Sequence, residues 1–365
     1  MGPMAGVRVV DMSQVISGPL AAAWLADQGA DVIKIEDAGG DPARTIGPRK
    51  DDMSALYFAV NRGKSGRVVD LKSEAGKREV CELIKTADVL LQNFRPGVAE
   101  RLGFGYEAVA ALKPDIVYCS ISGFGDEGPR AKGRAYDGVV QAVAGVAACQ
   151  AGPNGEPDLV RSYICDKTTS LIAAQAIAAA LFARARTGKG QRVDINMLDA
   201  AIAFIWPEGM WNHAFMDEAP APQPEVSAGY RLWRTKDGHI ALSSLQQVEF
   251  EATTRALGIP EVARDPRFSS IVERMKNREA YQAIAEKALA QWPTLELEKR
   301  LAAEDAPGGR VNSRASLIEE PQALANGTFV EVDAGELGRV RAPRHPVRFS
   351  ATPVAPPRPA PRLRK

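Results

Sequence analysis

Short apolar runs alternate with helical segments along the first third of the chain, and this alternation restricts the possible folds most strongly. The runs are rich in β-branched residues and have the length of buried strands, at 7–11, 31–36, 89–92 and 116–121. Between the first two, Gly18-Pro19 opens an Ala/Leu-rich helical segment that ends near Gly29, and 77–86 also has helical spacing. Strands joined through helices run parallel, so the pattern predicts an α/β fold with a doubly wound parallel sheet.

A long Ala-rich helix is predicted in the middle of the chain, over residues 170–185. Thr187-Gly188-Lys189-Gly190 provides a C-terminal stop signal, with a cation and glycines. The most apolar part, 171–183, is too short to span a bilayer, so we expect no membrane insertion. A strand and then a helix are expected within 193–203.

The second half predicts a smaller α+β region. Residues 207–224 contain four prolines and read as a connector. Two short strands around Lys236-Asp237-Gly238 predict a hairpin, and 249–303 is mostly helical. From Pro343 onward the chain holds seven prolines, which favours an extended tail that wraps a surface rather than folding alone.

Charge and cysteine content exclude some classes of function. A formal net charge of +1 gives no electrostatic footprint for nucleic acid or for an anionic membrane. The four cysteines form no Cys-x-x-Cys pair, and the start has no secretory pattern, so we expect reduced thiols and a cytoplasmic protein. The three histidines are not spaced as a metal site, and we expect no metal.

The segment Gly123–Gly128 spells Gly-x-Gly-x-x-Gly after a predicted strand. A dinucleotide site would need a helix to open at this point, with its N-terminus on the pyrophosphate. Pro129 and then Lys132-Gly133-Arg134 follow instead. We therefore expect the glycines to shape a mobile loop and not to bind a nicotinamide or flavin.

Asp166 lies just before the long helix and supports two interpretations. Aspartate is among the best N-cap residues, so it can simply begin the helix. A helix N-terminus also stabilises an ionised carboxylate, which keeps it available as a nucleophile. The two roles are compatible, and the residue alone does not decide between them.

Two other segments and a group of cations each have both a structural and a functional interpretation. Tyr136-Asp137 can be a turn with Asp137 as a helix cap, and Asn93–Gly97 can be an ordinary strand-to-helix loop. Open α/β sheets, however, bind ligands at such an edge. Five cations near these segments form either a solvated face or a phosphate-attracting group: Arg62, Lys64, Lys72, Arg95 and Arg101.

Taken together, these segments resemble the class III CoA-transferases, a family that includes formyl-CoA transferase, carnitine CoA-transferase and the alpha-methylacyl-CoA racemases. The resemblance covers nearly the whole chain and is densest over 6–204. It rests on residues 6–11, 18–19, 25–36, 61–64, 70–72, 87–97, 102–103, 187–191 and 193–194.

The resemblance implies an architecture. Residues 1–205 and 325–365 would form a large Rossmann-like, CoA-binding domain. A linker over 206–226 would lead to a small α+β domain over 227–305, with a return linker over 306–324. Two such chains would interlock as a homodimer.

The resemblance also implies a reaction and a site. Asp166 would attack a donor acyl-CoA, giving an aspartyl anhydride and then an aspartyl–CoA thioester, from which CoA passes to a free carboxylic acid. Tyr136 matches an active-site tyrosine of formyl-CoA transferase. CoA, as a substrate, would contact Val15, Lys72, Asn93, Phe94, Arg101, Leu102 and Arg134.

Departures from the family pattern leave the branch open. The glutamine of formyl-CoA transferase near the catalytic aspartate is Ile16 here, and no Gly-rich flap appears around 226–250, which argues against formyl or oxalyl specificity. In the racemase the acid/base histidine falls on Tyr136 and its supporting glutamate on Gln246. A neutral tyrosine is a poor base near pH 7, so transferase is favoured over racemase. A non-catalytic CoA-binding paralogue is the third alternative.

Overall fold

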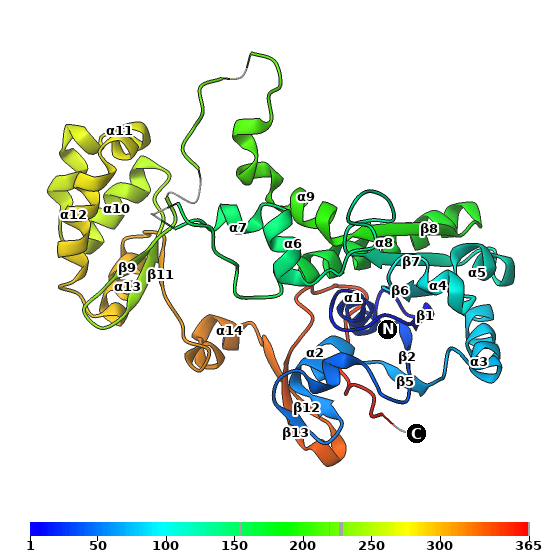
Figure 1. The fold of residues 1–365 in the computed structure, drawn as a ribbon. Coiled ribbons are helices and arrows are strands. Elements are labelled where there is room, and N and C mark those ends of the chain that lie inside the picture. Colours follow the sequence, from blue (N-terminus) through cyan, green and yellow to red (C-terminus); the bar gives the residue numbers. More distant parts are fainter. Residues whose placement is uncertain (153–154, 219, 226–228, 364–365) are drawn as a thin grey trace. The chain divides into compact units, whose positions relative to one another are not determined.

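The computed structural model describes residues 1–152, 155–218, 220–225 and 229–363 (Figure 1). The chain divides into two compact units: a large unit of Met1–Gln223 with Ala325–Lys365, and a small unit of Pro224–Leu324. Positions 219 and 226–228 lie outside the described residues. They belong to the expected first linker, the start of the expected small domain and the region compared with the Gly-rich flap.

A six-stranded sheet forms the centre of the large unit, and all its neighbouring strands pair in parallel. Its order is β5-β2-β1-β6-β7-β8. The strands are β1 (Arg8–Asp11), β2 (Asp31–Glu36), β5 (Ser65–Val68), β6 (Val89–Gln92), β7 (Val117–Ser122) and β8 (Gln191–Asn196). The expected strands are confirmed, and β5, which is short and mostly polar, gave no apolar signal. The strand order reverses between β1 and β6, the position where open α/β sheets form a ligand-binding crevice.

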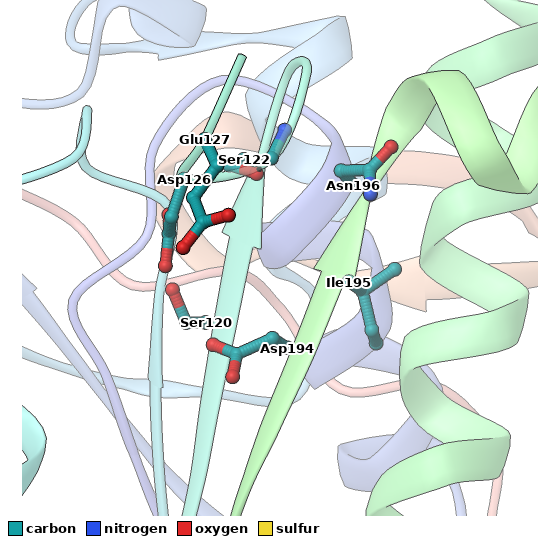
Figure 2. A pocket seen from close by; sticks show the side chains of 8 residues that line it. Ser120, Ser122, Asp126, Glu127, Asp194, Ile195 and Asn196 are labelled. Atoms are coloured by element: carbon teal, nitrogen blue, oxygen red, sulfur yellow. Dashed lines mark hydrogen bonds between the residues drawn. The ribbon is translucent and has the colours of Figure 1, made fainter. Parts of the chain in front are cut away.

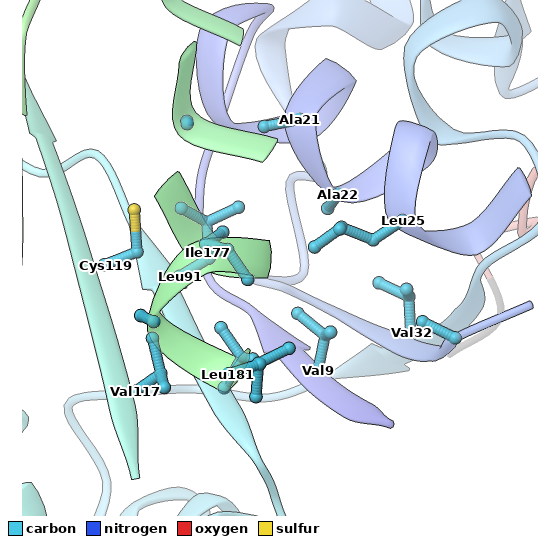
Figure 3. Packing of buried hydrophobic residues seen from close by; sticks show 14 of the residues in the cluster. Val9, Ala21, Ala22, Leu25, Val32, Leu91, Val117, Cys119, Ile177 and Leu181 are labelled. Carbon is cyan, nitrogen blue, oxygen red and sulfur yellow. The ribbon is translucent and has the colours of Figure 1, made fainter. Parts of the chain in front are cut away.

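Helices cover both faces of this sheet. On one face, α1 (Ser17–Asp27) and α8 (Ile164–Thr187) pack side chains such as Leu25 and Ile177 against Val9, Leu91 and Cys119 of the strands (Figure 3). On the other face lie α3 (Glu74–Lys85), α4 (Val98–Leu102) and α5 (Tyr106–Leu112). The large unit also contains α2 (Ala55–Asn61), α6 (Asp137–Val143), α7 (Val146–Cys149), α9 (Met197–Gly209) and the short strand pair β3 (Arg49–Lys50) and β4 (Met53–Ser54).

Helix α8 begins six residues earlier than the sequence predicts. With 24 residues it is long and apolar enough to cross a membrane, so the expectation that this segment is too short was wrong. Length and composition alone are weak evidence for a membrane span, because the core helix of a soluble protein has the same properties. Its buried apolar residues pack against α1, β7 and β8, whereas Leu171 and Phe182 are exposed.

The small unit pairs a three-stranded sheet with helices. The expected hairpin is present as β9 (Leu232–Arg234) and β10 (His239–Leu242), and β11 (Gly308–Arg310) adds a third strand. Its helices are α10 (Gln247–Leu257), α11 (Ile271–Lys276), α12 (Arg278–Leu289) and α13 (Thr294–Ala303). Strand β11 lies among the residues expected to form the return linker, and α9 extends to Gly209, within the first expected linker.

After α14 (Pro321–Ala325) the chain rejoins the large unit through a hairpin of β12 (Phe329–Asp333) and β13 (Arg339–Pro343). Among the described residues, the proline-rich tail that follows forms no helix or strand and lies along the large unit. Arg358 and Gly63 exchange hydrogen bonds, and Arg44 donates to the carbonyl of Pro361 at 3.1 Å. The tail thus wraps a surface, as expected.

Candidate active site

Polar side chains from β1, from β2 and from the loop after β6 hold the loop between β1 and α1. The Ser13 N–H donates to Asp11 Oδ1 at 3.0 Å, and Lys34 Nζ donates to the Ser13 carbonyl. Asn93, which follows β6, accepts from the Gln14 N–H at 2.7 Å and donates to the Gln14 carbonyl at 2.8 Å. This amide therefore joins the loops after β1 and β6 across the crevice where the strand order reverses.

Two buried ion pairs support that loop. Lys34 Nζ lies 2.9 Å from Asp41 Oδ2, and Lys64 Nζ lies 2.7 Å from Asp11 Oδ2, with all four side chains fully buried. Burial would raise the pKa of Asp11, but Lys64 and Lys34 outweigh it and hold this pKa below its ordinary value. Both carboxylates are thus compensated by cations.

Residue Val15 holds an unusual backbone conformation within this loop. Its φ of +69° is strained for a β-branched residue. The Val15 N–H donates to Asp41 Oδ1 at 3.1 Å, so the same carboxylate that pairs with Lys34 holds the strained turn. Such strain is stored where the surrounding structure over-determines it, often at functional sites.

Asp166 lies in the first turn of α8 and is not its N-cap. The helix begins at Ile164, and the Asp166 N–H donates to Asp137 Oδ2 at 2.9 Å. Asp137, the first residue of α6, therefore satisfies an N-terminal N–H of α8 from a separate helix, and it is not the cap of its own helix. Both local cap predictions were wrong because the capping interaction comes from distant sequence.

Gln141 fixes the segment that leads into α8. Its Nε2 donates to Asp137 Oδ1 at 2.5 Å and to the carbonyls of Val160 and Ser162 at 3.1 and 3.2 Å. Its Oε1 accepts the Val160 N–H at 2.9 Å. Since Gln141 and Asp137 are both buried, helix α6 rigidly positions the first turn of α8.

The electrostatic environment of Asp166 favours its neutral form. Burial and the facing charge of Asp137 raise the pKa of Asp166 to about 6, although hydrogen bonds from the Ser17 hydroxyl and backbone N–H act in the opposite direction. Within the described chain, Asp166 forms no ion pair. A carboxylate with such a pKa, beside the carboxyl edge of a sheet, is a candidate catalytic group.

Helix α1 meets α8 directly beneath this carboxylate. The Ser170 hydroxyl lies 2.8 Å from the Ser17 carbonyl and 2.7 Å from the Asp166 carbonyl, so it links the first turns of the two helices. Ser17 and Ser170 are buried. Sequence reasoning did not single out either serine, because the contact joins residues 153 positions apart.

The predicted CoA-contact residues gather around the carboxyl edge of the sheet. Phe94 and Leu102 pack partly buried on one face, together with Leu71, which precedes Lys72. Lys72, Arg101 and Arg134 are exposed, whereas Val15, Asn93, Phe94 and Leu102 are half-buried. The amide of Asn93 is already committed to Gln14, so its first role is to position a loop.

Two of the five cations that could attract phosphate are instead buried in ion pairs, so they cannot bind the phosphates of a ligand. Arg62 Nη2 lies 2.6 Å from Asp27, Lys64 pairs with Asp11, and both cations are buried. Burial lowers the pKa of Lys64 to about 8 despite Asp11. Lys72, Arg95 and Arg101 remain exposed.

Tyr136 is 67% exposed and immediately precedes Asp137, which contacts Asp166. Among the residues that the structure describes, its hydroxyl has no hydrogen-bond partner. Gln246, the other residue that the racemase comparison singled out, is the exposed N-cap of α10 in the small unit, where its N–H donates to Glu249 at 2.9 Å.

The glycine segment after β7 forms turns and no helix, with Gly125 and Gly128 at φ of +86° and +88°, so it is a loop and not a dinucleotide fingerprint. Beside it is a cavity of about 370 Å³ lined by Ser120, Asp126, Glu127 and Asp194 (Figure 2). The carboxylates of this cavity would repel an anion such as a phosphate, and none of the predicted site residues lines it.

In the described ranges, no cluster of three or more His, Cys, Asp or Glu side chains is placed to hold a metal ion.

Comparison with known proteins gives a consistent result. The family pattern described as CoA-transferase family III matches residues 4–365. Acetyl-CoA:oxalate CoA-transferase of Acetobacter aceti is 36% identical over 359 residues, covering 96% of this chain and 90% of that protein. Succinate–glutarate CoA-transferase of Agrobacterium fabrum is 33% identical, covering 99% and 93%. The crystal structure of a CAIB/BAIF family protein from Brucella suis superposes with a TM-score of 0.87 at 33% identity, covering 99% and 96%.

Proposed function

The chain belongs to CoA-transferase family III, and from this premise we propose that it moves CoA from an acyl-CoA donor to a free carboxylic acid, with Asp166 as the nucleophile. The observation that carries this proposal is the first turn of α8. There the Asp166 carboxylate faces Asp137, without a cation, and its pKa is raised to about 6. Near neutral pH such a carboxylate is mostly ionised, yet no ion pair restrains it from attack.

The proposed reaction has four acyl transfers. Asp166 attacks the donor thioester carbon, forming an anhydride and releasing the CoA thiolate. The thiolate attacks the Asp166 carboxyl carbon, releasing the donor acid and leaving an aspartyl–CoA thioester. The acceptor carboxylate displaces CoA from that carbon, and the thiolate then attacks the acceptor carbonyl, which regenerates the Asp166 carboxylate. Every step exchanges one acyl bond for another, so no external oxidant or reductant is needed.

We place CoA at the carboxyl edge of the sheet, where the order reverses between β1 and β6. The exposed cations Lys72, Arg101 and Arg134 would meet its phosphates. Half-buried Val15 and Leu102 would contact the adenine or pantetheine. Ser17, the first residue of α1, follows this loop, and the Ser170 hydroxyl links its carbonyl to that of Asp166, so the loop would connect CoA binding with the segment of the nucleophile.

Small carboxylic acids are the first substrates to test, because the named relatives are transferases of acetyl-CoA with oxalate and of succinate with glutarate. We further propose a cytoplasmic, interlocked homodimer. Large apolar side chains exposed near the end of α9 support a partner surface on the large unit: Phe204, Trp206, Trp211 and Phe215.

The test is an exchange panel, in which acyl-CoAs are incubated with free acids and new thioesters are identified by mass spectrometry. The wild-type protein should form exchanged thioesters, and Asp166→Asn should not. A racemase would instead introduce solvent deuterium at the α-carbon of a 2-methylacyl-CoA without any acceptor acid. Binding of CoA without either reaction would identify a non-catalytic paralogue and would contradict the proposal.

A further inference from the structure

We propose that Glu36 is a positioning residue for CoA binding, which acts through Asp41 on the backbone of Val15. The inference rests on the proposed function, because that function places CoA against Val15. It extends the set of predicted CoA contacts to a residue that is itself buried and would not touch CoA.

Four donors converge on the Glu36 carboxylate at the end of β2. Arg44 donates from Nη2 to Oε1 and from Nε to Oε2, both at 2.7 Å. The Tyr57 hydroxyl donates to Oε1 at 2.5 Å, and the Asp41 N–H donates to Oε2 at 2.8 Å. Burial would raise the pKa of Glu36, but these hydrogen bonds outweigh it and hold this pKa below its ordinary value. The carboxylate is therefore ionised and fully used as an acceptor.

Glu36 thereby fixes the turn that carries Asp41. It binds the backbone N–H of Asp41 at one end of this turn and the side chain of Arg44 at the other. Asp41 Oδ1 accepts the Val15 N–H at 3.1 Å, and Asp41 Oδ2 binds Lys34 at 2.9 Å. Strain such as the positive φ of Val15 persists only where the surroundings over-determine it. The direction of the Asp41 carboxylate, which Glu36 sets, therefore decides whether Val15 keeps this conformation.

The C-terminal tail closes another side of this cluster. Arg44 Nη2 donates to the Pro361 carbonyl at 3.1 Å, and Arg44 Nη1 donates to the Asp52 carbonyl at 3.0 Å. Arg362 in turn forms an ion pair with Asp52. Glu36 is 6% exposed and Arg44 is 4% exposed. Water therefore does not readily replace a hydrogen bond that a substitution removes.

A second buried pair in the same unit provides a matched control. Arg62 Nη2 lies 2.6 Å from Asp27 Oδ2, and both side chains are buried. Among the described residues, the Asp27 carboxylate receives its hydrogen bonds from Arg62 alone. Asp27→Asn should therefore weaken a buried ion pair of the same kind without an effect on Val15.

The experiment compares Glu36→Gln with Asp27→Asn in the full chain. In either orientation of the new amide, its NH2 group faces a donor of Arg44, so the turn is no longer held. In Glu36→Gln, KM for the acyl-CoA and the calorimetric Kd for CoA should rise about tenfold, the factor typical of one lost charge-assisted hydrogen bond. Because the nucleophile is untouched, kcat at saturating acyl-CoA should be nearly unchanged. Asp27→Asn should keep the wild-type KM, Kd and kcat.

Hydrogen exchange measures the loop without CoA. The Val15 N–H should exchange faster in Glu36→Gln and at the wild-type rate in Asp27→Asn, as followed by mass spectrometry of the peptide that contains Val15. A double-mutant cycle then tests the route through the strained turn. Glycine adopts a positive φ without strain, so Glu36→Gln should reduce CoA affinity less in the Val15→Gly background than in the wild-type chain.

Tyr57→Phe is a milder second variant, which decides the question if Glu36→Gln does not fold. It removes one donor to Glu36 and keeps the ring over which Arg44 lies, so CoA affinity should weaken in the same direction by a smaller factor. Wild-type CoA affinity in the folded variants, with Asp166→Asn inactive, would overturn the role of Glu36 and leave the proposed function intact. Full exchange by Asp166→Asn would overturn the proposed function itself, whereas the Kd for CoA and the exchange rate of the Val15 N–H would still test Glu36.

Discussion

Two groups of carboxylates at the same edge of the sheet have opposite electrostatic environments. Asp11, the last residue of β1, and Asp41, after β2, are each paired with a fully buried lysine. Asp166 and Asp137, at the first turns of α8 and α6, face each other without a cation among the described residues. We call them the paired centre and the unpaired centre.

The two centres have different roles: the paired centre supports the fold, and the unpaired centre contains the proposed nucleophile. The paired centre holds the loop from Ser13 to Val15, including a strained φ, and its lysines keep the pKa of Asp11 below its ordinary value. In the unpaired centre, burial and the charge of Asp137 raise the pKa of Asp166. Buried charges are expensive unless they are paired, so we take the lack of a cation beside Asp166 in the described part of the chain as a sign of a chemical role and not of a stabilising one.

The largest expected effect comes from neutralising the unpaired centre. Asp166→Asn should lower CoA exchange by roughly 10⁴-fold or more, as removal of a covalent nucleophile does. Its free energy of unfolding at pH 8 should be unchanged or higher, because the pKa of Asp166 in the folded protein lies above the ordinary value of an aspartate. The ionised form therefore destabilises the fold above about pH 6, and the penalty disappears as the pH falls through and below that value. Urea denaturation with exchange assays checks both results, and a marked loss of stability would break the contrast.

Breaking the paired centre should act mainly on stability. Lys34→Met leaves Asp41 buried without its cation, and it removes the donor to the Ser13 carbonyl. The free energy of unfolding should fall by about 3–5 kcal/mol, the usual result of removing one partner of a buried ion pair. Lys72→Met, at an exposed position, is the control for stability. A loss below about 1 kcal/mol would show that the lysine does not support the fold.

Removing the charge of Asp137 should change the pH dependence of kcat/KM. The wild-type kcat/KM should fall as the pH drops below about 6, since Asp166 must be ionised to attack. In Asp137→Asn the amide oxygen can still accept the Asp166 N–H, but the repelling charge is gone. The acid limb should therefore move to lower pH. A limb that stays in place would show that Asp137 does not set the pKa of Asp166.

The smallest effect is expected at the strained turn beside the paired centre. Val15→Gly relieves a left-handed conformation, worth about 1–2 kcal/mol, but it adds flexibility to the unfolded chain and removes a half-buried side chain. The free energy of unfolding should change by less than about 1 kcal/mol, whereas affinity for CoA should weaken if Val15 contacts it. Calorimetry of unfolding and of CoA binding tests the two parts separately.

The sheet could be predicted from sequence because its inner strands are continuous apolar runs such as Val89–Gln92. The paired centre and the unpaired centre could not be predicted, because their contacts join residues that are far apart in the sequence. Arg62 and Lys64 read as a solvated face, yet their partners Asp27 and Asp11 lie 35 and 53 residues away. Asp166 was interpreted as a local helix cap from its residue type. The carboxylate that binds the N-terminal N–H of α8 is instead that of Asp137, 29 residues upstream, which no local pattern indicates. Its importance came from the resemblance, and its environment came only from the structure.

The most direct test of the central claim follows oxygen atoms. The acceptor acid is supplied with heavy oxygen in its carboxylate, together with an unlabelled acyl-CoA, and the digested protein is examined by mass spectrometry. If the acceptor attacks the Asp166 carbon and CoA then attacks the acceptor carbonyl, one heavy oxygen must remain on the Asp166 carboxylate. The label is expected in the peptide containing Asp166, and an unlabelled peptide during continuing exchange would contradict the covalent role of Asp166.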